Sequence, residues 1–274
     1  MYVWLDALIN YLSAIGYPDK KYKKFWPANV HVIGKDIIRF HAVYWPAFLL
    51  AADIEPPKRI FAHGWWTNEG KKISKSLGNV IDPNEIIKTY GIDTLRFFLL
   101  REVPFGNDGD FSKKSLQRRM NNDLANDLGN LVQRVLTIIN KNLDGKLSKI
   151  KQIKENDKKI YEYPEELLKN IEKNYEKQEF HKVIENIWKL ISKANKYVDE
   201  SAPWQLIKDD RERAGDVLNI LVIIIAKIAI FLAPIMPDIS ENILNKIGLS
   251  IKNLTMEDIG KDTFLNIDHI IKKP

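Results

Sequence analysis

The feature that most constrains the fold is an alternation of short strands and helices in the first third of the chain. Residues 30–36 are typical of a buried strand that ends in a glycine turn, and residues 59–65 of a second strand. Between them, residues 37–50 carry bulky apolar side chains at helical spacing. This order predicts a parallel sheet with crossover helices. A further helix is expected to begin at Asp82-Pro83, because Asp is a good N-cap and Pro suits the first helical position.

The pattern changes near residue 111. A loop rich in glycine and polar residues at 103–111 is followed by a segment in which glycine is sparse and helical periodicity takes over. We therefore expect two domains, residues 1–111 and residues 112–274. Asp93 is expected to cap a helix that runs through Arg101. The remaining expected helices are 2–15, 112–142, 165–177, 180–200, 211–233 and 237–247, with a charged connector at 144–163.

Composition excludes several classes of site. The chain has 274 residues, 42 Lys+Arg against 36 Asp+Glu, and no cysteine. It therefore contains no disulfide and no thiolate metal site, so zinc is not expected within this chain, and a cytoplasmic protein is favoured. The most apolar run, residues 217–233, is interrupted by Asn219 and Lys227. A membrane span needs about 20 apolar residues, so we expect a buried bundle helix and no membrane partner.

A cationic loop, Lys72-Ile73-Ser74-Lys75-Ser76, lies between the second strand and the helix at Asp82. Mobile lysines suit a polyphosphate, because ammonium groups can meet the charge that develops on a leaving group. The alternative is an ordinary lysine-rich surface loop. Gly34 and Asp36 follow the first strand, where a tight turn and a helix N-terminus favour an anion. Asp36 could instead be only an N-cap.

These motifs together resemble a known family. The sequence is similar to the class I aminoacyl-tRNA synthetases, and within them to the methionyl-tRNA synthetase family. The lysine loop is similar to the second signature of that class, usually K-M-S-K-S, with Ile73 in the methionine position. The resemblance implies the second half of a Rossmann-like class I catalytic domain, followed by an α-helical anticodon-binding bundle. It implies an ATP-dependent methionine–tRNA ligase. It rests on Gly34-Lys35-Asp36, on the lysine loop and residues 77–83, and on Trp4, Tyr11, His41 and Trp45.

The resemblance also assigns site residues. Catalytic lysines that stabilise the departing pyrophosphate are Lys72 and Lys75. The ATP-binding set is Gly34, Lys35, Asp36, Ser74 and Ser76, with both serines expected to hold the shape of the loop. The methionine-binding set is Trp4, Ala7, Tyr11, Ile37, Phe40, His41 and Trp45. The anticodon-binding set is Asn130, Arg134, Pro203 and Trp204. An aromatic pocket suits a polarisable thioether; the alternative for these aromatics is simple core packing, and for Trp204 a core position at a helix end.

The first signature of the family, H-I-G-H or similar, does not occur in the sequence; His31-Val32-Ile33-Gly34 lacks the closing histidine. We therefore expect a C-terminal portion that acts with a catalytic half carrying that signature. The implied ligands are methionine, ATP with Mg²⁺, and tRNA(Met), read through its CAU anticodon. One alternative is a non-catalytic RNA-binding module derived from a synthetase. Another is a nucleotidyltransferase with no tRNA partner, in which Asn130, Arg134 and Trp204 would have no role.

Overall fold

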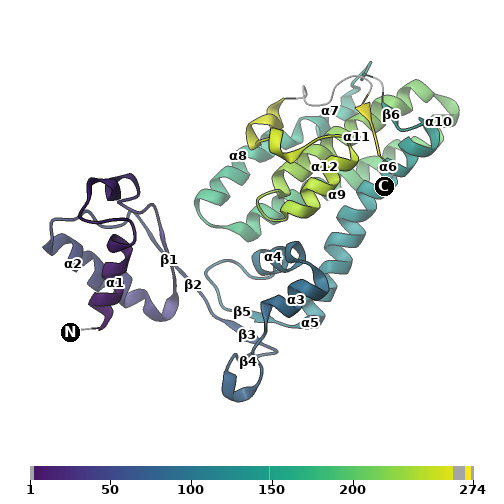
Figure 1. The fold of residues 1–274 in the computed structure, drawn as a ribbon. Helices are drawn as coiled ribbons and strands as arrows, with labels where there is room; N and C mark the ends of the chain where they lie inside the picture. Colours follow the sequence, from purple (N-terminus) through teal and green to yellow (C-terminus); the bar gives the residue numbers. More distant parts are fainter. Residues whose placement is uncertain (1–2, 148, 262–268, 273–274) are drawn as a thin grey trace. The chain divides into compact units, whose positions relative to one another are not determined.

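The computed structural model describes residues 3–147, 149–261 and 269–272, and the chain divides into two compact units (Figure 1). Unit 1 comprises residues 1–79 and 105–110, and unit 2 comprises residues 80–104 and 111–274. The chain therefore passes between the units after residues 79, 104 and 110. Each unit has its own hydrophobic core, so each is described separately.

The expected parallel strand pair forms the centre of unit 1. Strand β1 (His31–Gly34) pairs with β2 (Ile60–His63) in parallel, with His31 opposite Ile60 and Gly34 opposite His63. Helix α1 (Val3–Ser13) precedes the pair. Its Leu8 and Leu12 pack with residues of the crossover, which fixes α1 against the same core. The strand pair and α1 confirm the expected α/β character of this part of the chain.

The crossover between the two strands is less regular than the expected helix at 37–50. It begins with a 3₁₀ turn, η2 (Lys35–Ile37), continues through a π-helical stretch, η3 (Phe40–Tyr44), and ends as α2 (Trp45–Ala51). The amide of Trp45 donates to the carbonyl of Phe40, five residues back. A π-helical turn contains one more residue than an α-helical turn. The side chains that follow it therefore point in a different direction from the one that a continuous α-helix would give them. Such turns often occur at functional sites.

A small hairpin follows, where the sequence pattern indicated only turns and loops. Strand β3 (Trp66–Asn68) pairs with β4 (Lys71–Lys72), and β5 (Gly109–Phe111) lies on the other side of β3. The prediction of a loop throughout 103–111 is therefore wrong at its end. The hairpin turn is Glu69-Gly70, with φ of 51° and 74°. Positive φ at both positions matches the twist of paired strands, which explains a two-residue turn here.

In unit 2, helix α3 (Pro83–Tyr90) begins as expected, with Asp82 accepting from the amide of Asn84 at 2.8 Å. The prediction that Asp93 caps the next helix is wrong. The N-cap of α4 (Ile92–Arg101) is Gly91, and Asp93 lies inside the helix. The carboxylate of Asp93 accepts instead from the amide of Ile239 at 2.7 Å. That amide belongs to the first turn of α12 (Pro237–Lys246), where free N–H groups need an acceptor. Burial raises the pKa of this carboxyl.

The remaining helices confirm the expected bundle, with changes in detail (Figure 1). The long helix expected at 112–142 consists of α5 (Lys113–Arg119), a π-helical stretch η5 (Met120–Gly129) and α6 (Asn130–Asn142). The connector expected at 144–163 contains a helix, α7 (Glu155–Tyr161), because the buried Asp157 anchors it. The others are α8 (Tyr163–Glu176), α9 (Phe180–Ser201), α10 (Pro203–Asp209) and α11 (Arg211–Leu232). Minor elements are η1 (Lys20–Lys24), η4 (Lys75–Leu77), β6 (Lys146–Leu147) with β7 (His269–Ile270), η6 (Ile251–Asn253) and η7 (Met256–Gly260).

Helix α11 forms the centre of the bundle. By length and composition it could cross a membrane, yet 94% of its apolar window is buried within the described part of the chain. It contacts α6, α7, α9, α10 and α12. The ammonium of Lys227, fully buried in this helix, lies 5.5 Å from the centre of the Tyr161 ring. The apolar run therefore serves as the core helix of the bundle, as the sequence predicts.

Candidate functional sites

The side chains predicted to bind methionine form an aromatic cluster in unit 1. Trp4, from α1, stacks on Phe40, from the π-helical stretch, with ring centres 4.0 Å apart. The hydroxyl of Tyr11 lies 2.9 Å from Nε2 of His41, and Nδ1 of His41 lies 3.0 Å from the carbonyl of Ile37. Because a carbonyl can only accept, Nδ1 donates to it. In the neutral ring Nε2 must then accept from Tyr11. Both hydrogen bonds fix the orientation of the imidazole.

Two other members of this predicted set take different positions. Ala7 is exposed on α1, three residues after Trp4 and four before Tyr11, so all three lie on one helix face. Trp45 is 1% exposed and belongs to the core of unit 1, where its ring lies 6.1 Å from Tyr11. Trp45 therefore packs against Tyr11 from the core side of the cluster. A role for either residue in binding methionine remains a prediction.

Sequence reasoning missed His31, which belongs to the same cluster. Its ring lies 4.4 Å from that of Tyr11 and 6.4 Å from that of His41. Burial, and secondarily the nearby His41, lower its pKa, so the ring is neutral at pH 7. Nδ1 of His31 is buried without a hydrogen-bond partner among the described residues. Its place in an apolar strand gave it the appearance of an ordinary core residue.

The predicted nucleotide-binding segment begins at the end of β1. Gly34 is the N-cap of the 3₁₀ turn, and Asp36 makes no capping hydrogen bond there. A Cβ on Gly34 would lie 2.5 Å from Oδ1 of Asp36, so a larger residue here would force the Asp36 carboxylate to move. Asp36 Oδ1 accepts instead from the indole of Trp65 at 3.4 Å. The alternative of a simple N-cap for Asp36 is therefore wrong.

Lys35 is held by two residues that the sequence did not single out. Its ammonium lies 2.6 Å from the carboxylate of Asp108 and 4.6 Å from the centre of the Trp65 ring. Asp108 also accepts from the backbone amide of Trp65 at 2.8 Å. The hydrogen bond from Lys35 lowers the pKa of Asp108, which keeps this carboxylate charged. These bonds bring the segment just before β5 next to the end of β1.

The lysine loop starts at the end of β4. The ammonium of Lys72 lies 5.8 Å from the centre of the same Trp65 ring. The hydroxyls of Ser74 and Ser76 are 2.6 Å apart, and the amide of Ser76 donates to Ser74 Oγ. This arrangement supports the expectation that both serines hold the shape of the loop. The side chain of Lys75 lies outside the described part of the structure. Lys35, Lys72 and Trp65 thus place two cations around one indole.

The predicted anticodon residues lie on two helices of unit 2. The guanidinium of Arg134, on α6, lies 5.8 Å from the ring centre of Trp204 and 2.6 Å from a carboxylate oxygen of Asp199. Trp204 is 42% exposed, and Pro203 beside it begins α10 after the left-handed Ala202. Together they form an exposed indole beside a fixed guanidinium, which is suited to an unpaired base.

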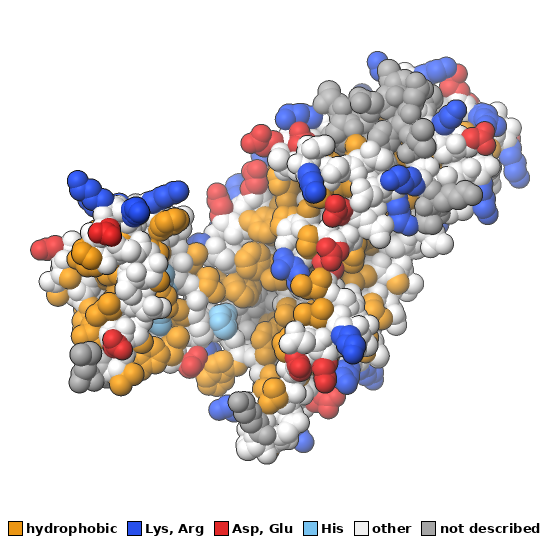
Figure 2. Space-filling view, viewed as in Figure 1, with side chains coloured by type: hydrophobic (Ala, Val, Ile, Leu, Met, Phe, Trp, Pro, Cys, Tyr) orange, Lys and Arg blue, Asp and Glu red, His pale blue; other side chains and the backbone are white. Residues whose placement is uncertain are grey.

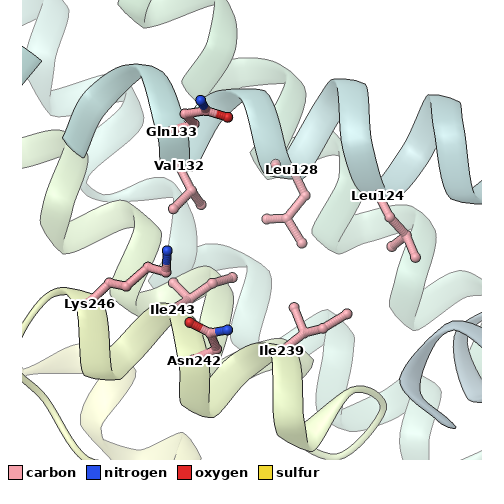
Figure 3. A pocket seen from close by; sticks show the side chains of 9 residues that line it. Leu124, Leu128, Val132, Gln133, Ile239, Asn242, Ile243 and Lys246 are labelled. Carbon is pink, nitrogen blue, oxygen red and sulfur yellow. The ribbon is translucent and has the colours of Figure 1, made fainter. Parts of the chain in front are cut away.

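Asn130 is the first residue of α6 and is exposed. It lies one helical turn before Arg134, so the two share a face. A separate cavity of about 250 Å³ lies between the long helix and α12 (Figure 3). Figure 3 shows Leu128 and Val132 facing Ile243 across it, with Lys246 at one end. None of the predicted site residues lines this cavity. Among the residues that the structure describes, no group of three or more His, Asp or Glu could hold a metal ion.

Comparisons with known proteins bear on both units. Residues 1–136 match the family model described as tRNA synthetases class I (M). Residues 148–269 match the model for the anticodon binding domain of methionyl tRNA ligase. The chain belongs to the methionyl-tRNA synthetase family. The family match confirms the fold class and the lineage that the lysine loop and the aromatic residues predict.

Individual relatives of this family agree. The methionine–tRNA ligase of Rickettsia felis is 49% identical over 100% of this chain and 54% of its own length. That of Caldanaerobacter subterraneus is 46% identical over 94% of this chain and 41% of its own length. The Mycobacterium tuberculosis enzyme solved in complex with methionyl-adenylate superposes with a TM-score of 0.94 at 41% identity, over 100% of this chain and 55% of that one. The chain spans about half the length of the curated relatives it matches.

Proposed function

We propose that this chain supplies the methionine pocket, the second signature loop and the anticodon-reading surface of a cytoplasmic methionine–tRNA ligase. The observation that carries the proposal is the likeness, over the full chain, to an enzyme solved with methionyl-adenylate. In the reaction, the carboxylate of methionine attacks the α-phosphate of ATP in line and releases pyrophosphate. A ribose hydroxyl at the end of tRNA(Met) then attacks the carbonyl carbon and releases AMP.

Catalysis of the first step is positional and electrostatic. Lys72 and Lys75 stabilise the negative charge that develops on the departing pyrophosphate. Stabilisation of this kind matters most in this step, because the transfer leaves little covalent chemistry for the protein to perform. Gly34 and Asp36 approach the nucleotide, and Lys35 stays beside them because Asp108 holds its ammonium at 2.6 Å. Mg²⁺ enters with ATP, since it binds readily through phosphate oxygens.

Recognition of methionine rests on the cluster around Tyr11 and His41. The stacked pair Trp4 and Phe40 offers an apolar aromatic wall to the thioether, and sulfur makes favourable contacts with aromatic rings. Tyr11 and His41 add a polar pair at 2.9 Å in an otherwise apolar region. Because Tyr11 donates its hydroxyl hydrogen to His41 and His41 donates to the Ile37 carbonyl, this pair fixes the shape of the pocket. Preference for the thioether over a hydrocarbon of the same shape then rests on the contacts of sulfur with the aromatic wall.

Recognition of tRNA rests on the indole of Trp204 and the guanidinium of Arg134. The indole stacks on an anticodon base, and the guanidinium, oriented by Asp199 at 2.6 Å, hydrogen-bonds a base edge. Pro203 and Asn130 complete the surface. We divide the chain by proposed function into residues 1–111 for the chemistry and residues 112–274 for tRNA binding. The division by packing differs, because residues 80–104 pack with the helices of unit 2.

A complete adenylate site also needs the first signature. We propose that another segment supplies it, either in the same polypeptide or in a separate one. Unit 1 is built to receive such a segment, because β1 leaves Val32 52% exposed. Figure 2 shows hydrophobic side chains gathered over the visible face of this unit, around α1 and α2. Exposed apolar area of this kind is what a docking segment would cover.

The experiment is methionine-dependent exchange between ATP and pyrophosphate. The 274 residues alone are expected to give no exchange above background, and addition of a polypeptide carrying the first signature is expected to restore it. In the restored enzyme, Lys75→Ala should lower kcat about 100-fold with little change in the KM for methionine, because an oxyanion-type contact is worth that much. No exchange under any combination, with tRNA binding intact, would instead favour the non-catalytic RNA-binding module.

A further inference from the structure

The carboxamide of Asn79 bridges two backbone groups of the lysine loop. Its Oδ1 accepts from the amide of Ser74 at 2.9 Å, and its Nδ2 donates to the carbonyl of Lys72 at 3.0 Å. These two backbone groups flank Ile73. The side chain of Asn79 thus donates one hydrogen bond and accepts one, as the backbone of a neighbouring β-strand would. Asn is the side chain suited to this, because it carries a donor and an acceptor on one short amide.

Asn79 is itself anchored to the hairpin. Its own carbonyl accepts from Nδ2 of Asn68, the last residue of β3, at 2.8 Å. Gly78 precedes it with φ of 63°, a left-handed conformation that lets the chain turn back toward the start of the loop. Both ends of the segment from Lys72 to Asn79 are therefore fixed to the same two-stranded hairpin.

The hairpin is in turn fixed to the rest of unit 1 through Asp110. Oδ1 of this residue accepts from the amide of Gly70 at 2.7 Å and from the hydroxyl of Thr67 at 2.5 Å. Asp110 lies in β5, 40 residues beyond Gly70 in the sequence. A chain of hydrogen bonds therefore runs from β5, through the hairpin, to the closure of the loop at Asn79.

We propose that Asn79 is a positioning residue that closes the lysine loop and fixes the backbone from which Lys72 projects. Lys71, Lys72 and Lys75 fall within five consecutive residues, so their like charges oppose a compact loop backbone. Closure holds their backbone before a ligand arrives, which reduces the reorganisation needed when charge develops. The consequence for catalysis rests on the proposed function of the loop, whereas the closure itself does not.

Two substitutions at this position separate the two hydrogen bonds. Asn79→Asp keeps the oxygen that accepts from the amide of Ser74. It replaces the donor to the carbonyl of Lys72 with a second oxygen, so that hydrogen bond is lost and two acceptors face each other. Asn79→Ala removes both bonds. Asn84→Ala is the matched control, because Asn84 is exposed on α3 and its side chain takes part in none of these bonds. The closure hypothesis requires the loop to loosen in Asn79→Ala and Asn79→Asp and to stay unchanged in the control.

The first measurement is limited digestion of the full chain with trypsin, followed by mass spectrometry of the fragments. Cleavage after Lys72 and Lys75 should be about tenfold faster in Asn79→Ala than in the wild type, since two hydrogen bonds of ordinary strength restrain the loop. Asn79→Asp should also be faster, and thermal unfolding of the chain should stay unchanged in each variant. Equal loop cleavage in Asn79→Ala, Asn79→Asp and the control would overturn the proposal.

The second measurement concerns the ligand and the chemistry. Inorganic pyrophosphate should slow loop cleavage in the wild type and in Asn84→Ala, and should protect Asn79→Ala less. Absence of protection in the wild type would count against the proposed function, while the unliganded cleavage rates still decide whether Asn79 closes the loop. In the restored exchange assay, Asn79→Ala should lower kcat about tenfold with an unchanged KM for methionine. A raised KM with unchanged kcat would assign Asn79 to substrate binding and overturn a positioning role.

Discussion

At the scale of the single residue, Trp204 gives the sharpest test of tRNA recognition. Trp204→Ala removes the exposed indole beside Arg134, and stacking on an unpaired base is worth about 1–3 kcal/mol. We expect the affinity for an anticodon stem-loop RNA with the CAU triplet to fall about 5- to 150-fold, measured by fluorescence anisotropy. Trp65→Ala, at a similarly exposed indole of unit 1, is the control and should leave this affinity unchanged. Equal affinity of wild type and Trp204→Ala would remove the assignment.

Several candidate site residues lie close together in the sequence, so the family resemblance and local spacing could single them out. Lys72, Ser74 and Ser76 share one short motif, and Trp4 and Tyr11 share one helix face. Asp108 could not be predicted in the same way, because its partner Lys35 lies 73 residues away in the sequence. Only the folded chain places these residues side by side. Contacts between distant segments are the part of a site that local spacing does not determine.

At the scale of the element, the β3–β4 hairpin depends on its two-residue turn. Gly70 has φ of 74°, and a Cβ there would meet no atom within 4 Å. Gly70→Ala should therefore cost about 1–2 kcal/mol purely through the left-handed backbone. Glu69→Gly should act in the opposite direction, because Glu69 has φ of 51°. Hydrogen exchange of the Asn68 and Lys71 amides measures both effects.

The control for the hairpin is Gly260→Ala. Gly260 also has no atom within 4 Å of a Cβ, and its φ lies outside the left-handed region. This substitution should leave exchange in the hairpin unchanged. An equal loss of protection in Gly70→Ala and Gly260→Ala would show that the backbone conformation of the turn is not what holds the hairpin.

The anchor of α7 gives a prediction that depends on pH. Asp157 is fully buried, receives two hydrogen bonds from Arg213 at 2.6 and 2.8 Å, and accepts from the hydroxyl of Tyr197 at 2.8 Å. Burial acts to raise its pKa, but the hydrogen bonds from Arg213, the Lys154 amide and Tyr197 outweigh it, and the pKa is lowered. The carboxylate therefore stabilises the fold fully above its unfolded pKa of about 3.9, and this contribution is lost as pH falls through the folded pKa.

Asp157→Asn should accordingly lower the free energy of unfolding by about 3–5 kcal/mol at pH 7, because it leaves the guanidinium of Arg213 without its charged partner. The difference from the wild type should shrink as pH falls below about 4. Urea unfolding followed across pH measures both. Asp209→Asn, at an exposed position, should change stability by less than about 0.5 kcal/mol at every pH. A difference between wild type and Asp157→Asn that does not vary with pH would contradict this account.

Long periodic helices were predictable, and the shortest strands of the hairpin sheet were not. Helices α9 and α11 each run for 22 residues, enough for apolar spacing to repeat over several turns. Strands β3 and β5 have three residues each, too few for an alternating pattern. Helix α7 was missed for a different reason. Its sequence is rich in lysine, and its one fully buried anchor is the charged Asp157, which hydropathy counts as solvent-exposed.

At the scale of the whole molecule, the open face of β1 predicts a dependence on another segment. Val32→Lys should change the stability of the isolated chain by less than about 0.5 kcal/mol, because Val32 is already 52% exposed. The same substitution should abolish restoration of exchange by a polypeptide carrying the first signature, since it places a charge in the apolar contact. Phe25→Lys, at 61% exposure outside α1 and α2, is the control and should permit restoration. Full restoration with Val32→Lys would place the contact elsewhere.

The interleaved path of the chain limits how this protein can be cut or recombined. Residues 80–104 join the helical unit even though residues 105–110 return to unit 1. Phe97, in this early stretch, is fully buried in the helical core, with its ring 4.8 Å from that of Trp188. A gene fragment that began after residue 111 would therefore encode helices with a gap in their core. The helical unit therefore keeps a complete core as one contiguous segment only if α3 and α4 are included with it.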